Sequence, residues 1–309
     1  MAFTAKDVAN LRAQTGAGMM DCKKALTATD GNMEKAAEYL REQGVNIAAK
    51  KASRIASEGI VSAFVSADGK VGALAEINCE SDFVAKSDPF VALGVAVARQ
   101  VAETDPADLD TLLAAQSVTE KGSTVTDLVN NATAKIGEKL SVRRFVRFAT
   151  ECGRQEFYLH MGGKIGVLLE VATDKDLSGN AEFATMCHDI AMHIAASAPK
   201  FVYPEEVPAE ETEREKEILK AQVMNEGKPA AVADKIITGR IKKFYKEICL
   251  VEQEFVKNPD VTVGKLVEDF GKKAGANVKI VRFASFVMGE GLEKKVDNLA
   301  EEVAKMQNR

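Results

Sequence analysis

Residues 60–76 read IVSAFVSADGKVGALAE, and their pattern is the strongest indication of the class of fold. Two apolar runs, 60–65 and 71–77, flank the dipeptide Asp68-Gly69. Asp-Gly between two alternating apolar runs is a strong signal for a β-hairpin closed by a type I′ turn, in which both central residues have positive φ. The stretch therefore predicts two antiparallel strands rather than a helix.

The same order of segments recurs further along the chain. GKVGALAE at 69–76 is echoed by GKIGVLLE at 163–170. Residues 183–196 likewise resemble the helix expected at 89–101, and residues 278–283 resemble the strand expected at 141–148. Such self-similarity indicates a duplicated unit. The sequence therefore predicts an α+β fold whose duplicated core has two small antiparallel sheets, each covered by helices.

The first fifty residues have a helical rather than an alternating period. Thr4 with Asp7 predicts a capping box at the start of a first helix, and a second helix is expected to start near Asp21. Asn32 is the expected cap of a third helix, which we expect to end at Gly44. Three short helices of this size predict a compact bundle of the ubiquitin-associated type.

A polar, helical segment at 204–248 interrupts the second unit. Its ascending arm is rich in glutamate, and its descending arm is basic with Ile236 and Ile241 on an apolar stripe. Opposite charges on two arms favour an antiparallel helical hairpin, which is a short coiled coil. The stripe is satisfied either within the hairpin or by homodimerisation through it.

These features predict where the domains begin and end. The expected segments are an N-terminal three-helix domain (1–55), the first half of the core (56–151), the second half of the core (152–203 and 249–288), the hairpin insert (204–248) and a C-terminal helical module (289–309). Within the first half of the core, residues 105–139 are expected to be helical.

Composition and charge limit the classes of partner. The chain of 309 residues has 41 basic and 46 acidic side chains, and the basic ones are dispersed, so nothing favours nucleic acid as a partner. Its five cysteines include no C-x-x-C pair, which indicates a reducing compartment. The N-terminus lacks the pattern of a signal peptide, and the longest apolar run is far shorter than the ~20 residues that cross a bilayer. We expect a cytoplasmic protein without a membrane partner.

The sequence shows no recognisable set of catalytic residues. Of its three histidines, His188 and His193 are five residues apart and so do not share a helix face as a metal pair would. His160 is alone, and no histidine or basic cluster adjoins Cys79 to lower the pKa of its thiol. The chain is therefore predicted not to be an enzyme and to need no metal and no cofactor.

Two segments suggest exposed contacts, and each leaves two interpretations open. Residues 11–26 read LRAQTGAGMMDCKKAL, in which Met19 and Met20 are consecutive and cannot both face one core stripe. Either one methionine is exposed for a partner, or both are core residues at a tight turn. Residues 77–85 read INCESDFVA. Either Asp82 and Phe83 form an exposed probe, or Asp82 caps a short turn while Phe83 packs on the sheet.

Taken together, these segments resemble the signatures of the elongation factor Ts family. Residues 11–26 are similar to its N-terminal signature, and residues 78–85 resemble its second hallmark, in which threonine usually stands where this chain has Ser81. Further similar segments are residues 190–197, 239–244, 281–283 and 289–291. The chain is thus identified as a member of the bacterial-type family, and the likeness runs along its whole length in the expected order.

This resemblance implies a nucleotide-exchange factor that acts on the translation GTPase elongation factor Tu. The residues implied to contact the nucleotide-binding domain of Tu are Arg12, Met19, Met20 and His160. The residues implied to disturb its Mg²⁺ and phosphate site are Ser81, Asp82, Phe83 and Val84, with Phe83 as the wedge. The C-terminal helix would return to the nucleotide domain. A ubiquitin-associated-type protein-binding adaptor is the alternative, which explains the N-terminal helices but leaves the duplicated core without a purpose.

Overall fold

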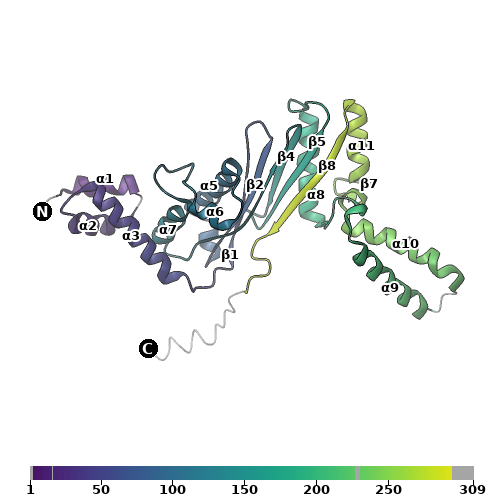
Figure 1. The fold of residues 1–309 in the computed structure, drawn as a ribbon, viewed down its shortest axis with the longest axis horizontal. Coiled ribbons are helices and arrows are strands. Elements are labelled where there is room, and N and C mark those ends of the chain that lie inside the picture. The colour runs from purple at the N-terminus through teal and green to yellow at the C-terminus, as the bar shows by residue number, and fades with distance from the viewer. Residues whose placement is uncertain (1–2, 16, 227–229, 294–309) are drawn as a thin grey trace.

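The computed structural model describes residues 3–15, 17–226 and 230–293. Helices and small antiparallel sheets make up these residues, so the predicted α+β class is confirmed. Figure 1 shows an elongated molecule with two sheets at its centre and helices on their outer sides. The N-terminal helices lie at one end, and the helices of the segment 209–248 project from the opposite end.

The first sheet is antiparallel and has the order β1-β2-β3. Its strands are β1 (Glu58–Val65), β2 (Val71–Cys79) and β3 (Ser141–Ala149). The helices that share its core are α4 (Asp82–Ala85), α5 (Asp88–Thr104), α6 (Leu109–Ala114) and α7 (Val125–Ile136). Strand β2 is buried from Gly72 to Cys79 because helices cover one of its faces and the second sheet covers the other.

The β1–β2 connection is a hairpin, but the predicted turn type is wrong. Among residues 66–70 only Gly69 has a positive φ (71°), and its N–H donates to the Ser66 carbonyl at 2.8 Å. That geometry belongs to a type I turn followed by a left-handed residue. The Asp68 carboxylate accepts from the Ser66 hydroxyl (2.5 Å) and the Lys70 amide (3.1 Å), so aspartate closes the loop through its side chain.

The helix predicted over 105–139 is interrupted. Helices α6 and α7 are separated by residues 115–124, within which Gln116 forms a β-bridge with Thr124. Thr124 and Asp127 then form a capping box that starts α7. The Thr-x-x-Asp spacing was a local signal for a helix start inside the stretch, and the apolar period alone did not reveal it.

The second sheet is also antiparallel and has the order β4-β5-β8. Its strands are β4 (Gly153–His160), β5 (Ile165–Thr173) and β8 (Val278–Val287). Helices α8 (Ala181–Ser197) and α11 (Val263–Ala274) pack on it. The connecting elements are the 3-10 turns η1 (Pro204–Glu206) and η2 (Leu250–Glu252) and the strands β6 (Glu254–Phe255) and β7 (Asn258–Thr262). Each unit thus contains a hairpin, a helix and a third strand in the same order.

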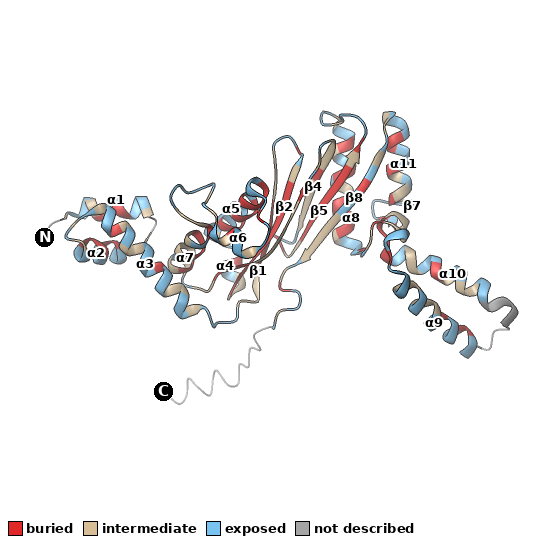
Figure 2. Ribbon diagram, viewed as in Figure 1, coloured by how far each residue is buried: buried red, intermediate tan, exposed pale blue. Residues whose placement is uncertain are grey.

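The two sheets pack face to face through an apolar layer. Its buried residues are Val61, Ala63, Leu74, Phe148 and Leu168. Backbone hydrogen bonds cross the layer in matched pairs: Gln155 N–H donates to the Gly69 carbonyl, and Val61 N–H donates to the Gly163 carbonyl, both at 2.7 Å. Figure 2 shows the central strands buried between the helices on either side. The layers therefore run helix, sheet, sheet, helix, with approximate two-fold symmetry.

Two glutamate–arginine pairs repeat this symmetry. Glu76 and Glu170 are both buried; Glu76 accepts from Arg144 Nε at 2.6 Å, and Glu170 accepts from Arg282 Nε at 2.7 Å. Each arginine also stacks on a phenylalanine of the other sheet, Arg144 on Phe286 (4.4 Å) and Arg282 on Phe148 (4.2 Å). Such cation–π contacts join the two sheets.

The N-terminal helices are α1 (Ala5–Thr15), α2 (Met19–Ala28) and α3 (Met33–Lys51). Their shared core contains Leu11, Cys22 and Leu26. The predicted capping box is present, because Thr4 N–H donates to the Asp7 carboxylate at 2.7 Å and Asp7 N–H donates to the Thr4 hydroxyl at 3.3 Å. The predicted cap of α3 is also present, since the Asn32 side chain accepts from an amide of the first turn at 3.0 Å.

The prediction that α3 ends at Gly44 is wrong, because the helix continues to Lys51. Gly44 is buried, and a Cβ placed there would lie 3.3 Å from Asn131 Oδ1 of α7. The glycine therefore allows α3 to approach α7 closely, a long-range requirement that looks like a helix end when the chain is read locally.

Helices α9 (Ala209–Asn225) and α10 (Ala230–Ile248) lie side by side and project from the second unit (Figure 1). Leu219, Val223 and Ile241 are buried, and Arg240 binds the Glu226 carboxylate at 2.8 Å. The turn at 227–229 and most of the predicted C-terminal helical module, residues 294–309, lie outside the described residues.

Candidate functional site

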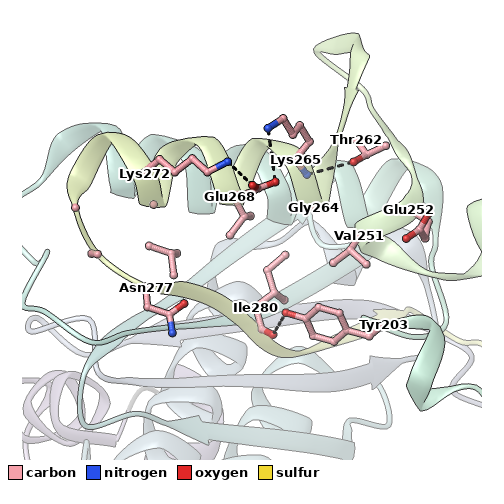
Figure 3. A pocket seen from close by; sticks show the side chains of 15 residues that line it. Tyr203, Val251, Glu252, Thr262, Gly264, Lys265, Glu268, Lys272, Asn277 and Ile280 are labelled. Carbon is pink, nitrogen blue, oxygen red and sulfur yellow. Dashed lines mark hydrogen bonds and ion pairs between the residues drawn. The ribbon is translucent and has the colours of Figure 1, made fainter.

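A groove of about 860 Å³ lies between α11 and β8 (Figure 3). Lys265, Glu268 and Lys272 on its helical side pair with one another, and Tyr203 donates its hydroxyl to the Ile280 carbonyl at 2.9 Å. None of the fifteen described residues that line it is a histidine or a cysteine. On its helical side the charged groups are thus paired within α11, and Glu252 of η2 is the other carboxylate among the described residues that line it.

Cys79 is buried at the end of β2 and donates its thiol to the Ser81 carbonyl at 3.1 Å. Burial, reinforced by the charge of Glu138, raises the pKa of the Cys79 thiol to about 12. A thiol with so high a pKa carries almost no thiolate near neutral pH and is a poor nucleophile.

The three histidines occupy separate environments. His193 is buried, and its Nε2 lies 2.9 Å from Gln253 Oε1 while its Nδ1 accepts from the Val256 amide at 3.2 Å. Burial lowers the pKa of His193, which therefore stays neutral at pH 7. The rings of His160 and His188 each lie against the ring of Tyr158. The described parts of the chain contain no group of three or more residues that could hold a metal ion.

The segment after β2 presents the most exposed aromatic side chain of the described residues. Phe83 is 83% exposed on the short helix α4. Ser81, not Asp82, caps this helix by accepting from the Val84 amide at 3.4 Å. The interpretation in which Asp82 caps the turn and Phe83 packs on the sheet is therefore wrong, and the exposed arrangement is present. Val84, in contrast to Phe83, packs against the apolar core between the first sheet and its helices.

Asp82 lies beside Phe83 with its carboxylate 2.7 Å from Lys86 Nζ. The hydrogen bond from Lys86 holds the pKa of the Asp82 carboxyl below its usual range, so it is ionised at neutral pH. The Lys86 side chain is largely exposed and that of Asp82 about half exposed, so this ion pair contributes little to stability and leaves the carboxylate accessible to a partner. The loop thus offers a ring and a negative charge side by side.

Glu138, a residue that no sequence pattern indicated, holds this loop. Glu138 follows α7 and lies more than fifty positions along the chain, yet its carboxylate accepts from the amides of Glu80 (3.1 Å) and Ser81 (3.0 Å) and from the Ser81 hydroxyl (2.6 Å). No local pattern reveals a contact over such a separation.

The turn that carries His160 lies next to the same loop. Lys164 binds Glu58 at 2.8 Å, and Glu58 is paired in register with Cys79, the last residue of β2. The charge of Lys164 also helps to lower the pKa of Asp82. His160 is exposed, and its neighbour Met161, which is not among the predicted contact residues, is 74% exposed with a φ of 49°. The structure therefore brings the His160 turn and the Phe83 loop to one end of the sheets.

The remaining candidates form a second, separate surface. Met19 and Met20 at the start of α2 are 46% and 63% exposed, and Arg12 on α1 is exposed. Both methionines are thus accessible, which excludes the interpretation that they are core residues. Helices α1 and α2 lie at the far N-terminal end of the molecule, away from α4 (Figure 2). One partner that touched both surfaces would have to span the first unit.

Comparison with known proteins gives consistent matches. The family model described as elongation factor TS matches residues 80–290, a range that begins at the Phe83 loop. Elongation factor Ts of Clostridium perfringens (strain SM101 / Type A) is 49% identical over 304 residues, covering 98% of this chain and 99% of that protein. Elongation factor Ts of Trichlorobacter lovleyi is 48% identical over 305 residues, covering 98% of each. None of the described helices is long and apolar enough to cross a membrane.

Proposed function

Because this chain belongs to the elongation factor Ts family, we propose that it is a guanine-nucleotide exchange factor for the translation GTPase elongation factor Tu. It binds Tu loaded with GDP, promotes release of the GDP and performs no chemical step of its own. Its five cysteines are unpaired and four of them are buried, which suits the reducing cytoplasm in which we place this activity.

The observation that carries the proposal is the exposure of Phe83 on a capped, hydrogen-bonded loop. An aromatic ring costs free energy when it is left in water, and a rigid loop can insert such a ring without first being ordered. Ser81, Asp82, Phe83 and Val84 form the segment that would reach the Mg²⁺ and phosphate site of Tu. GDP is held largely through its phosphates and Mg²⁺, so a small displacement of these ligands removes much of its binding free energy.

Two further surfaces support the contact. His160 lies at the same end of the sheets as Phe83, and Arg12, Met19 and Met20 lie on the N-terminal helices, which we infer to be a bundle of the ubiquitin-associated type. We assign these four residues to the nucleotide-binding domain of Tu. Exposed methionines adapt to a partner because their side chains are flexible and polarizable. Coupling between sites is reciprocal, so bound GDP must weaken this protein as much as this protein weakens GDP.

The domain division and the helical insert belong to the same proposal. We retain the division 1–55, 56–151, 152–203 with 249–288, 204–248 and 289–309. The insert at 204–248 would act as a coiled coil that contacts the partner or a second copy of the chain, and the C-terminal module would return to the nucleotide domain. An adaptor based on the N-terminal helices alone would leave the family match at 80–290 unexplained.

The test is the rate of release of fluorescent GDP from purified Tu. We expect the native chain to accelerate release strongly and Phe83→Ala to lose about tenfold or more of that acceleration, as when a buried aromatic contact is removed at an interface. Val95→Ala is the matched control, because Val95 is an exposed apolar residue on α5, outside the loop. Acceleration that survives Phe83→Ala would move the mechanism to Arg12 or His160, and no acceleration by the native chain would reject the proposal.

A further inference from the structure

Two chain segments that are distant in sequence exchange carboxylate–amide hydrogen bonds beneath the Phe83 loop. Glu138 accepts from the backbone of residues 80 and 81 and from the Ser81 hydroxyl. In return, the Glu80 carboxylate accepts from the amide of Lys139 at 2.6 Å. Hydrogen bonds to an ionised acceptor are stronger than neutral ones. We call these contacts the 80–138 clasp.

The clasp acts on Phe83 through Ser81. The Ser81 hydroxyl donates to Glu138 and accepts from the Val84 amide, so one side chain joins the clasp to the first turn of α4. Phe83 is the second residue of that helix. The direction in which its ring leaves the protein surface therefore depends on where Glu138 holds Ser81.

The second unit provides an internal control, because it contains only half of the clasp. Gly137 after α7 and Gly275 after α11 are equivalent left-handed caps, and the residues that follow them are Glu138 and Ala276. The second half is retained: Asp174 accepts from the Asn277 amide at 2.8 Å, as Glu80 accepts from the Lys139 amide. The segment after Asp174 presents no exposed ring, since its Leu177 packs against the second core.

This difference separates two roles. The carboxylate–amide bond at Glu80 and at Asp174 occurs in both units, so it belongs to the shared frame. The contact from Glu138 occurs only in the unit that presents Phe83. Because the Glu138 contact is found only beside the loop that exposes Phe83, we attribute it to the presentation of that ring and not to the stability of the shared fold.

The clasp also reaches the N-terminal helices. Arg54, just beyond the end of α3, binds the Glu80 carboxylate at 3.2 Å, and its carbonyl accepts from Lys139 Nζ at 2.8 Å. The chain that leaves the N-terminal helices is thus tied to the residues that hold the loop.

We propose that Glu138 is a positioning residue that presents Phe83 to the partner and joins the loop to the N-terminal helices. The proposal rests on the proposed exchange function for its effect on GDP release, but the positioning itself can be measured on the free protein.

The first experiment measures hydrogen exchange of the Glu80 and Ser81 amides in the full chain without Tu. Glu138→Ala should speed exchange of both amides about tenfold or more, because each loses a charged acceptor. Glu103→Ala is the matched control: Glu103 is a surface carboxylate paired within α5 to Arg99 at 2.7 Å, and its loss should leave both amides unchanged. Equal exchange in the native and Glu138→Ala chains would overturn the proposal. If Glu138→Ala fails to fold, Glu138→Gln and Ser81→Ala take its place.

The second experiment is a double-mutant cycle on GDP release from Tu. Glu138→Ala should slow release about tenfold in the native background and should change nothing in the Phe83→Ala background, since it acts through that ring. An equal loss in both backgrounds would show that Glu138 acts elsewhere and would overturn the positioning role. If even the native chain fails to accelerate release, the proposed function fails, and the amide exchange rates still decide whether Glu138 holds the loop.

Discussion

The two units of the core use one frame for two different surfaces. In both, a hairpin leads into a helix, a third strand returns beside the hairpin, and a buried glutamate binds an arginine opposite it. After β2, residues 80–85 form a capped turn from which Phe83 projects. After β5, residues 174–180 lead to α8, and Leu177 packs into the core. The strands and helices shared by both units thus position the site, and the loop after β2 provides its exposed residues.

The largest expected difference between the units lies in their buried glutamates. Glu76 is fully buried and accepts from Arg143 (2.9 Å), Arg144 (2.6 Å) and the Gly289 amide (2.9 Å), whereas the one ion pair of Glu170 is with Arg282 among the described residues. Glu76→Ala should lower the free energy of unfolding by about 3–5 kcal/mol, because it leaves two partly buried guanidinium groups and the Gly289 amide without their shared acceptor.

Glu170→Ala should cost only about 1–2 kcal/mol, since the arginine that it abandons is half exposed and can be hydrated. Urea denaturation of the two variants measures both losses. Equal losses would mean that the two glutamates have the same role and that the first unit does not depend on its extra partners.

A smaller difference is expected at the two loops. Leu177→Ala should lower the free energy of unfolding by about 1–2 kcal/mol, less than for a fully buried leucine because the side chain is half-buried. Phe83→Ala should change stability by less than about 0.5 kcal/mol, as surface substitutions usually do.

The same pair should give the opposite result in GDP release, with Phe83→Ala impaired and Leu177→Ala close to native at a temperature where it is folded. Thermal unfolding and GDP release are measured on one preparation of each variant, which tests whether Leu177 affects stability and Phe83 affects release. A large stability loss in Phe83→Ala would show that its ring is packed rather than presented.

The smallest effect concerns acid stability of the first unit. Burial alone would raise the pKa of Glu76, but the hydrogen bonds from the Gly289 amide and the two arginines hold it below its ordinary value. Its ionised form therefore stabilises the folded protein fully above the pKa of the unfolded chain, about 4.3, and this contribution is lost as the pH falls through the lower folded pKa.

Glu76→Gln should remove this part of the acid dependence. The urea midpoint of the native chain should fall more steeply between about pH 5 and pH 3 than that of Glu76→Gln. Parallel curves for the two proteins would show that other carboxylates cause the acid unfolding.

Local patterns predicted much of the frame. Asp68-Gly69 between alternating apolar runs located the first hairpin, and the repeat at 163–170 located the second. Thr4 with Asp7 and Asn32 located helix starts, because each cap uses donors and acceptors a few residues away. Two errors concern local contacts: Asp68 closes the first hairpin through its side chain in a turn other than the one predicted, and the capping box of Thr124 and Asp127 starts a helix inside the stretch predicted to be continuous. The third has a long-range cause: the helix does not end at Gly44, because the small size of this residue serves contact with α7, a helix that lies far along the chain.

The candidate site divides in the same way. Residues 77–85 were singled out in the sequence as a loop with a ring beside a carboxylate, but two interpretations of Phe83 stayed open. Only the structure decided between them, because exposure depends on what the rest of the chain leaves uncovered. It also decided that Met19 and Met20 are both exposed and that Met161, next to His160 in the chain, is exposed as well.

Patterns in the sequence were thus enough for most of the elements, for their duplication and for the family, since periodicity, caps and turns are interactions between neighbours in the chain. The tertiary structure alone decided which side of the loop faces water, how two sheets meet through Arg144 and Arg282, and that Glu138 supports Phe83. Those contacts join residues separated by many tens of positions. Their free energy depends on a geometry that exists only after the chain has folded.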